Sequence, residues 1–190
     1  MKILTALNHR IYQAASARLL LLLTIILFGL GYAITSSISP SAELMALAHG
    51  RNVPDAQFWR SADTLYSILS EYGMYGIHLY LTRISPVDLF IPLGQALFLS
   101  ITITLIFRHA FDSTNSDWQM LNTLPFAAMI GDYLENASIV SIMLSYPNRL
   151  GALAVAAGLF TFVKFIASII SIGLIIIGLI AWLAKWIRSV

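Results

Sequence analysis

Three polar side chains interrupt an apolar stretch in the second half of the chain. Within GDYLENASIVSIMLSYP, residues 131–147, they are Asp132, Glu135 and Asn136. Side chains three or four positions apart project from the same face of a helix, so these three would act together. Two neighbouring carboxyl groups whose environments differ can perform general acid and base chemistry. Asp132 and Glu135 are therefore candidates for proton transfer.

Lys164 offers a cation for these two acids. It lies in the middle of another apolar run, GLFTFVKFIASI. The turn signal Pro147-Asn148 joins the two runs, which predicts a helical hairpin. Residues equally far from such a turn lie at similar depth, and Lys164 falls opposite a point between Asp132 and Glu135. We predict that the three charged side chains meet and form a charge pair or a catalytic group.

The same count across the preceding connection brings Gln95 to about the level of Glu135. We therefore predict a buried polar cluster, with Gln95 and Asn136 as binding residues beside the three charged ones. Two carboxylates against one ammonium leave an excess negative charge, which protonation of one acid, a bound cation or His78 would balance. A second interpretation stays open, in which the cluster only holds helices together. Ionisable residues inside a membrane more often mark function.

Residues 61–84 are less apolar and contribute two further candidate binding residues, Glu71 and His78. Apolar side chains recur there at helical spacing, and Ser61 or Asp63 would cap the start of the helix. We predict a helix that lies in the membrane interface. A further membrane crossing is the alternative. His78 is also a candidate general acid or base.

Asp88 heads the next apolar run and has two interpretations, as an N-terminal helix cap or as a binding residue. The chain has no cysteine, which excludes disulfides and a cysteine nucleophile. It contains no HExxH or paired-histidine spacing, so we expect neither a metal site nor a cofactor. No basic run interleaved with aromatic residues occurs, and we expect no nucleic-acid partner.

The elements that must position these residues are predicted to be membrane-spanning helices. Of the 190 residues, 58% are hydrophobic and 11% are charged, whereas about 25% of an ordinary soluble domain is charged. Apolar runs long enough to cross a bilayer occupy residues 19–38, 87–107, 121–146 and 150–187. The predicted fold is an all-α membrane protein, a four-helix transmembrane bundle with an additional interfacial helix.

The four runs form a single transmembrane domain over residues 1–190. Residues 39–86 then lie outside the membrane, as a polar loop over 39–63 followed by the interfacial helix. The first run has too long a charged leader and too long an apolar stretch for a cleaved signal peptide, so we expect an uncleaved anchor. Basic residues concentrate beside the two termini, and this bias places both termini in the cytoplasm.

The blocks DYLEN, YP and TFVKF resemble a group of small bacterial integral membrane proteins with four spans. That group carries an Asp-x-x-Glu-Asn motif, a Tyr-Pro turn and a lysine in the last helix. The stretch EYGMYGIHLYL, followed by D-x-F-x-P, is similar to the part that precedes their second span, and Ile77 stands where they carry an arginine. The resemblance covers roughly residues 60–170. It implies a location in the bacterial inner membrane, but it implies no reaction. It also identifies five candidate site residues: Asp88, Asp132, Glu135, Asn136 and Lys164.

Three functions of different classes are compatible with this sequence. The first is an enzyme or binding protein for a lipid or another apolar small molecule, with the polar cluster acting on the bound molecule or holding its polar head. The second is a proton- or cation-coupled carrier or small channel. The third is a structural or assembly subunit. Membrane lipids or an apolar small molecule are the expected partners, and a homo-oligomer is compatible with all three functions.

Overall fold

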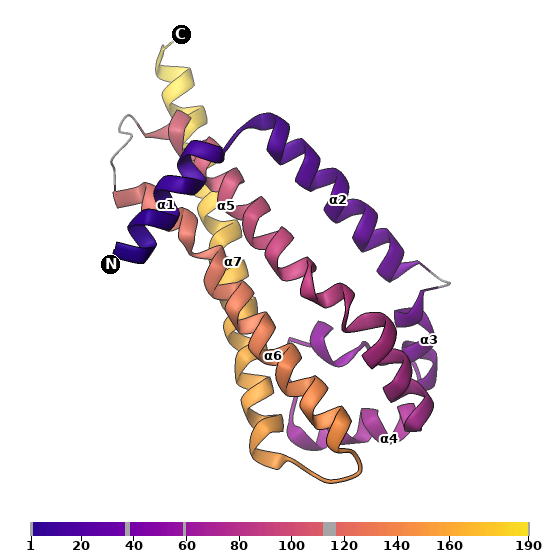
Figure 1. Cartoon of the computed structure of the whole chain (residues 1–190). Coiled ribbons are helices and arrows are strands. Elements are labelled where there is room, and N and C mark those ends of the chain that lie inside the picture. Colours follow the sequence, from indigo (N-terminus) through magenta and orange to yellow (C-terminus); the bar gives the residue numbers. More distant parts are fainter. Residues whose placement is uncertain (1, 37–38, 59, 112–116, 190) are drawn as a thin grey trace.

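The computed structural model describes residues 2–36, 39–58, 60–111 and 117–189, and within these ranges all regular structure is helical. The predicted all-α fold is therefore confirmed. Four long helices run alongside one another, as Figure 1 shows. They are α2 (Ala17–Thr35), α5 (Ile91–Ala110), α6 (Pro125–Ser145) and α7 (Gly151–Ser189).

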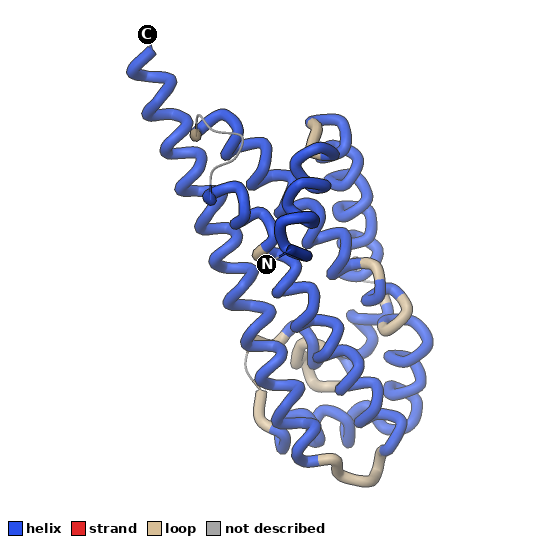
Figure 2. The backbone as a smooth tube through the Cα atoms, turned by 60° about the vertical axis from the view of Figure 1, so that its left-hand side comes forward, coloured by secondary structure: helices blue, strands red, loops and turns tan. Residues whose placement is uncertain are grey.

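Shorter helices lie at the two ends of this bundle (Figures 1 and 2). Helix α1 (Lys2–Ala14) packs at the end where α5 and α7 terminate, while α3 (Pro40–Leu47) and α4 (Ala62–Leu79) pack at the opposite end. Short helical turns complete the described structure: η1 (Pro54–Ala56), η2 (Tyr80–Ile84), η3 (Val87–Leu89) and η4 (Asp117–Thr123). The sequence also predicts a short polar connection from Arg108 to Gln119, of which residues 112–116 fall outside the described residues.

Serine side chains set the starts of three helices. The Ser16, Ser39 and Ser61 hydroxyls each accept a hydrogen bond from the backbone N–H three residues later, which satisfies one of the free donors of the first turn. One of the two predicted caps of α4, Ser61, is thus confirmed. The prediction that Asp88 caps the next helix is wrong, because Phe90 precedes α5 and no side chain caps it.

By length and composition, two helical segments of the described chain could each cross a membrane, Val87–Ala110 and Gly151–Ser189. Helices α1 and α2 meet the criterion only as a pair, with a bend of 97° between them. Helix α6 is long enough, but its three polar residues in the DYLEN motif lower its average hydropathy. Two long apolar helices indicate a membrane protein.

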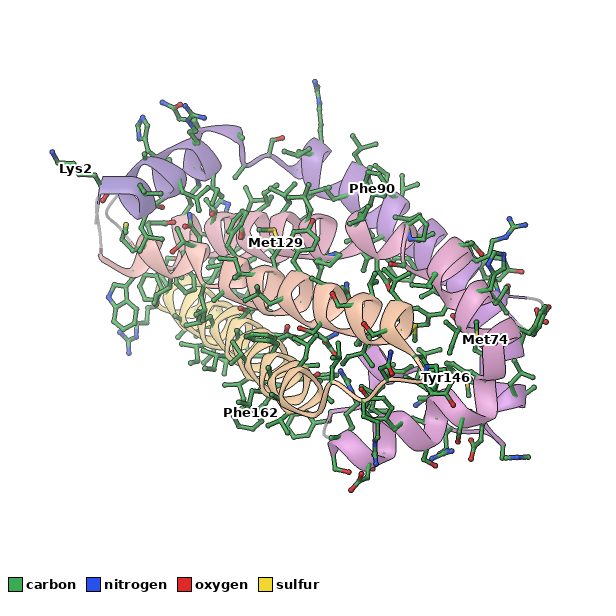
Figure 3. All side chains as sticks on the ribbon, turned by 60° about the horizontal axis from the view of Figure 1, so that its bottom comes forward. Lys2, Met74, Phe90, Met129, Tyr146 and Phe162 are labelled. Atoms are coloured by element: carbon green, nitrogen blue, oxygen red, sulfur yellow. The ribbon has the colours of Figure 1, made fainter. Side chains whose placement is uncertain are left out.

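The exposed surface of the long helices is apolar. Only 17% of the most apolar window of α7 is buried inside the protein. Phe28 on α2 and Ile180 on α7 are 77% and 63% exposed, and Phe90 and Phe162 project away from the ribbon in Figure 3. Apolar surface of this extent is normally covered by a partner or by lipid.

Helix α4 is held at its end of the bundle by an apolar cluster. Leu65 and Leu69 of α4 are fully buried with Leu44 of α3 and with Ile139 and Ile142 of α6. Within the described residues α4 is not among the segments that could cross a membrane. The predicted helix over 61–84 is confirmed in part: α4 and η2 occupy these residues, but the helix is broken at Gly73, whose φ of 56° is not helical.

A glycine brings α6 and α7 into close contact. A Cβ atom on Gly131 would lie 3.2 Å from the backbone N of Lys164 and 3.2 Å from the backbone O of Phe160. The two helices can approach this closely because glycine has no side chain. This contact sets the distance between the helix that carries the two acids and the helix that carries the lysine.

We expect Gly131→Ala to lower the free energy of unfolding by about 1–3 kcal/mol, because the backbone atoms that face the added methyl group cannot rotate away. Gly173→Ala is the matched control on α7, where an added Cβ meets nothing within 4 Å. That change should stabilise the helix by up to about 1 kcal/mol. Denaturant unfolding in mixed micelles, followed by circular dichroism, measures both. Equal effects of the two substitutions would contradict the close α6–α7 contact.

Candidate functional site

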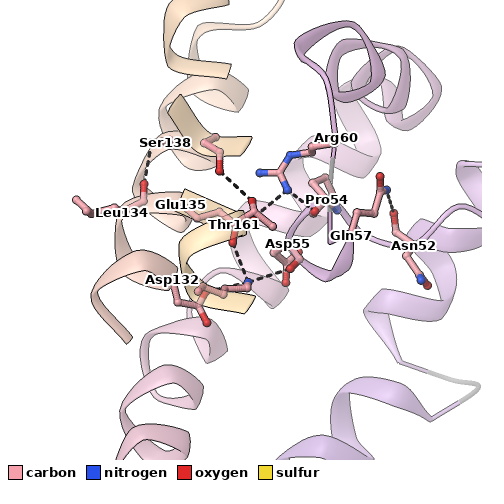
Figure 4. A network of polar contacts seen from close by, with 12 residues as sticks. Asn52, Pro54, Asp55, Gln57, Arg60, Asp132, Leu134, Glu135, Ser138 and Thr161 are labelled. Carbon is pink, nitrogen blue, oxygen red and sulfur yellow. Dashed lines mark hydrogen bonds and ion pairs between the residues drawn. The ribbon is translucent and has the colours of Figure 1, made fainter. Parts of the chain in front are cut away.

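The segment between α3 and α4 enters the bundle and forms one side of the polar site (Figure 4). It contains η1, and at its end the side chain of Arg60 has no exposed surface. Residues 39–63 are predicted to form a polar loop outside the membrane; the structure adds that Asp55 and Arg60 of this loop pack against α6 and α7. The physical reason is charge: Arg60 finds a carboxylate on α6, and an ion pair makes its burial tolerable.

Glu135 is the acid that Arg60 contacts, and it lies at the centre of the site. The Nη1 atom of Arg60 donates to its Oε1 atom at 2.8 Å, and the Thr161 hydroxyl donates to the same atom at 2.6 Å. Its other oxygen, Oε2, lies 2.8 Å from Nζ of Lys164. The Glu135 side chain is fully buried, so its charge is balanced by two cations from two different parts of the chain.

Lys164 joins this acid to the rest of the site. Besides Glu135, its Nζ atom lies 3.2 Å from Oδ1 of Asp132 and donates to the backbone carbonyl of Asp55 at 2.9 Å. An ammonium group has three N–H donors, and here they face three acceptors. The structure thus brings Asp132, Glu135 and Lys164 together, with the amine directed inward between α6 and η1.

The loop reaches this position because α7 leaves room for it. A Cβ atom on Gly158 would lie 3.1 Å from the backbone O of Arg60, so the loop passes close to the helix at a residue without a side chain. Arg60 also donates to the carbonyl of Pro54 at 2.5 Å. This bond joins the two ends of the re-entering segment and fixes the turn that carries Asp55.

Asp55 is a further acid of the site that sequence reasoning missed. Its Oδ1 atom accepts a hydrogen bond from the Tyr80 hydroxyl at 3.1 Å. Burial raises the pKa of Asp55 above its usual range, although the charge of Lys164 opposes the shift. Burial likewise raises the pKa of Tyr80 well above its ordinary value, so its hydroxyl stays a donor. Asp55 therefore holds a proton to a higher pH than an exposed aspartate does.

A cavity of about 570 Å³ lies beside the charged residues. Its walls come from α3, η1, η3, α5, α6 and α7. Four charged side chains on its surface, those of Asp55, Asp88, Asp132 and Lys164, lie close enough to interact electrostatically, and we call the part that they line the polar end; Gln95 also lies on the wall. The remainder is mainly apolar, with walls that include Ile91, Leu99, Met129, Phe165, Ile169 and Ile172. This volume and this lining are typical of a small-molecule site.

The other predicted site residues are distributed differently. Gln95 and Asp88 lie on the cavity wall. Asn136 is half-buried, and its Oδ1 atom has no hydrogen-bond partner among the described residues. Glu71 pairs with Arg51, and His78 is exposed; neither lines the cavity. His78 therefore does not balance the charge of the cluster, and Arg60 provides the additional cation.

The acids of the site do not form a recognisable metal centre. Within the part of the chain that the structure describes, no group of three or more histidine, aspartate or glutamate side chains could hold a metal ion. The chemistry that the site offers is that of its charged side chains and its apolar walls. It can hold a small molecule, bind its polar end, and exchange a proton with it through a carboxyl group.

Comparison with known proteins returns no relative: no protein-family model, no curated protein and no solved structure matches the chain. The resemblance to small four-span bacterial membrane proteins therefore stays a prediction.

Proposed function

We propose that this protein spans the bacterial inner membrane four times, through α2, α5, α6 and α7, with both termini in the cytoplasm. Two of these helices are apolar and long enough on their own, and the other two pack alongside them (Figure 1). In this arrangement α4 lies in the outer interface. The polar face of α6 is then covered by α7 and by the re-entering loop, so its charges do not meet lipid.

The distribution of basic residues supports this orientation. Arg108, at the end of α5, donates to the backbone carbonyls of Tyr12 and Ala15, and Lys185 of α7 reaches the carbonyl of His109. The termini therefore share one end of the bundle. Six of the eleven basic residues belong to the terminal segments or to the end of α5: Lys2, Arg10, Arg18, Arg108, Lys185 and Arg188. Such an excess marks the cytoplasmic side.

Within that frame, we propose that the protein binds a lipid or another apolar small molecule in the cavity. The observation that carries this proposal is a cavity among the long helices that has apolar walls and a charged end. Apolar walls favour a ligand that itself partitions from water into a bilayer. The charged end then selects ligands by their polar group. A charged side chain that loses its hydrogen bonds to water on ligand binding needs a ligand group that replaces those bonds.

The residues of the site would have different roles in this function. Asp132 and Lys164 line the cavity and would contact the ligand directly. Glu135 and Arg60 do not line it, and they act as positioning residues that hold Lys164 and the loop. If a reaction follows binding, Asp132 is the carboxyl group from which a proton could be exchanged with the bound molecule. Binding is the activity that the geometry supports best.

Native mass spectrometry of the protein purified in mild detergent tests this proposal. We expect a bound apolar molecule to remain with the unsubstituted protein. Ser168→Trp, on the half-buried cavity wall of α7, should displace it by filling much of the space. Ile170→Trp is the matched control, because Ile170 is 47% exposed and is not part of that wall.

Two results would contradict the proposal. One is that the unsubstituted protein never retains a molecule, even after lipid extract is added back. The other is that the two tryptophan variants retain ligand equally well, which would place the molecule on the outer surface of the helices and not in the cavity.

A further inference from the structure

The polar end of the cavity carries more acid than base. Three carboxyl groups line it, those of Asp55, Asp88 and Asp132, and Lys164 is the basic residue among its described lining residues. These groups come from η1, η3, α6 and α7, so the excess of acid results from the fold and not from one stretch of sequence.

The two cations nearby are already occupied. Nζ of Lys164 faces Glu135, Asp132 and the carbonyl of Asp55, and Arg60 is buried against Glu135. The acids Asp55, Asp88, Asp132 and Glu135 thus outnumber these two cations. The site is therefore poorly suited to a carboxylate or a phosphate, because no cation is left to bind it.

The carboxylate of Asp88 at the cavity has an oxygen without a donor. The Oδ2 atom of Asp88 is buried and has no hydrogen-bond partner among the described residues. Asp88 lies in η3, directly before α5, and is part of the cavity wall. A buried acceptor without a donor is unfavourable, and a donor on a bound molecule would relieve this, most strongly if that donor were charged.

We propose that the ligand has an apolar body and a cationic, hydrogen-bond-donating head, that is, an ammonium group, seated between Asp88 and Asp132. This inference rests on the proposed function, because it places the head of the bound molecule in the same cavity. The body lies along the apolar walls formed by α5, α6 and α7. The ammonium group supplies a donor to Oδ2 of Asp88 and a positive charge beside the excess of acids.

The absence of cysteine from the chain allows a direct test with a single introduced thiol. Ser168→Cys places it on the cavity wall, and the variant is reconstituted into lipid nanodiscs and alkylated with N-ethylmaleimide. Dodecylamine, dodecanol and dodecanoate are each titrated into the bilayer as protecting molecules at pH 7, and their concentrations are expressed as mole fractions of the lipid. We expect dodecylamine to protect the thiol at a concentration at least about tenfold lower than dodecanoate does.

A second substitution in the Ser168→Cys background tests the contact with Asp88. Asp88→Asn should raise the half-protecting concentration of dodecylamine about tenfold and leave that of dodecanol unchanged. Asp63→Asn is the matched control, since the Asp63 side chain is 88% exposed and pairs with Arg149 at the surface. It should change neither concentration.

The outcomes separate this inference from the function on which it rests. If dodecanoate or dodecanol protects as well as dodecylamine, the cavity binds an apolar molecule but the cationic head is refuted. The same holds if Asp88→Asn has no effect on dodecylamine. If none of the three molecules slows alkylation, the cavity takes up no such ligand and the proposed function fails as well.

Discussion

Arg60→Met is expected to lower the free energy of unfolding by about 3–5 kcal/mol, a large fraction of the total stability of a protein of this size. Neither Arg60 nor Glu135 exposes any side-chain surface. Removing the guanidinium group leaves the carboxylate of Glu135 with Lys164 as its single cation, and Lys164 must also serve Asp132. Glu135 is then buried with less than one compensating charge.

The control for this prediction is Arg51→Met, which removes another arginine of the same connecting segment. Arg51 pairs with Glu71, and their side chains are 35% and 26% exposed. Solvent screens such a pair, so the loss should stay within about 1 kcal/mol. Denaturant unfolding in mixed micelles measures both variants. Similar small losses for the two would show that Arg60 is not held inside the bundle.

Lys164→Met is expected to have the largest effect on ligand binding. It removes the cation shared by Asp132 and Glu135 and the donor to the carbonyl of Asp55. We expect ligand retention in native mass spectrometry to fall at least about tenfold, because η1, which carries Asp55 on the cavity wall, loses its bond to α7. Stability should fall by about 3 kcal/mol or more, because the acids are left buried without their partner.

The double substitution Asp132→Asn with Lys164→Met distinguishes a role of the cluster in ligand binding from a role in stabilising the packing of α6 against α7. It leaves Arg60 and Glu135 as a balanced buried pair, so most of the lost stability should return. Ligand retention should not return, because both charged groups that line the cavity beside Glu135 are gone. If the double variant both folds and retains ligand like the unsubstituted protein, the cluster serves only to hold α6 and α7 together.

Two features could be predicted from the sequence: the helices, and the contact of Lys164 with Asp132 and Glu135. Both follow from local features of the sequence, namely hydrophobic runs, capping residues and a short turn. A short turn joins α6 and α7, so the depth of Lys164 relative to Asp132 and Glu135 follows from counting residues. The apolar face of α7 requires the amine to turn inward, since a charge directed into hydrocarbon is unfavourable. Helical starts such as Ser61 followed from known capping preferences.

The contribution of the loop could not be predicted in the same way. No periodicity fixes the path of residues 52–60, and Arg60 has the composition of an ordinary surface residue. The excess negative charge predicted for the cluster did indicate that a cation was missing, but it could not identify Arg60 as that cation. Asp55 gave no signal at all, because its place in the site depends on the fold of the loop around Pro54.

An experimental density map of the protein purified with its native lipids tests the central claim most directly. That claim is that the loop around Asp55 and Arg60 closes the polar end of an occupied cavity. We predict Arg60 within hydrogen-bond distance of Glu135, and continuous density along the apolar walls that ends beside Asp88 and Asp132. A loop that lies outside the helices, or a cavity closed by packed side chains with no space for a ligand, would contradict it.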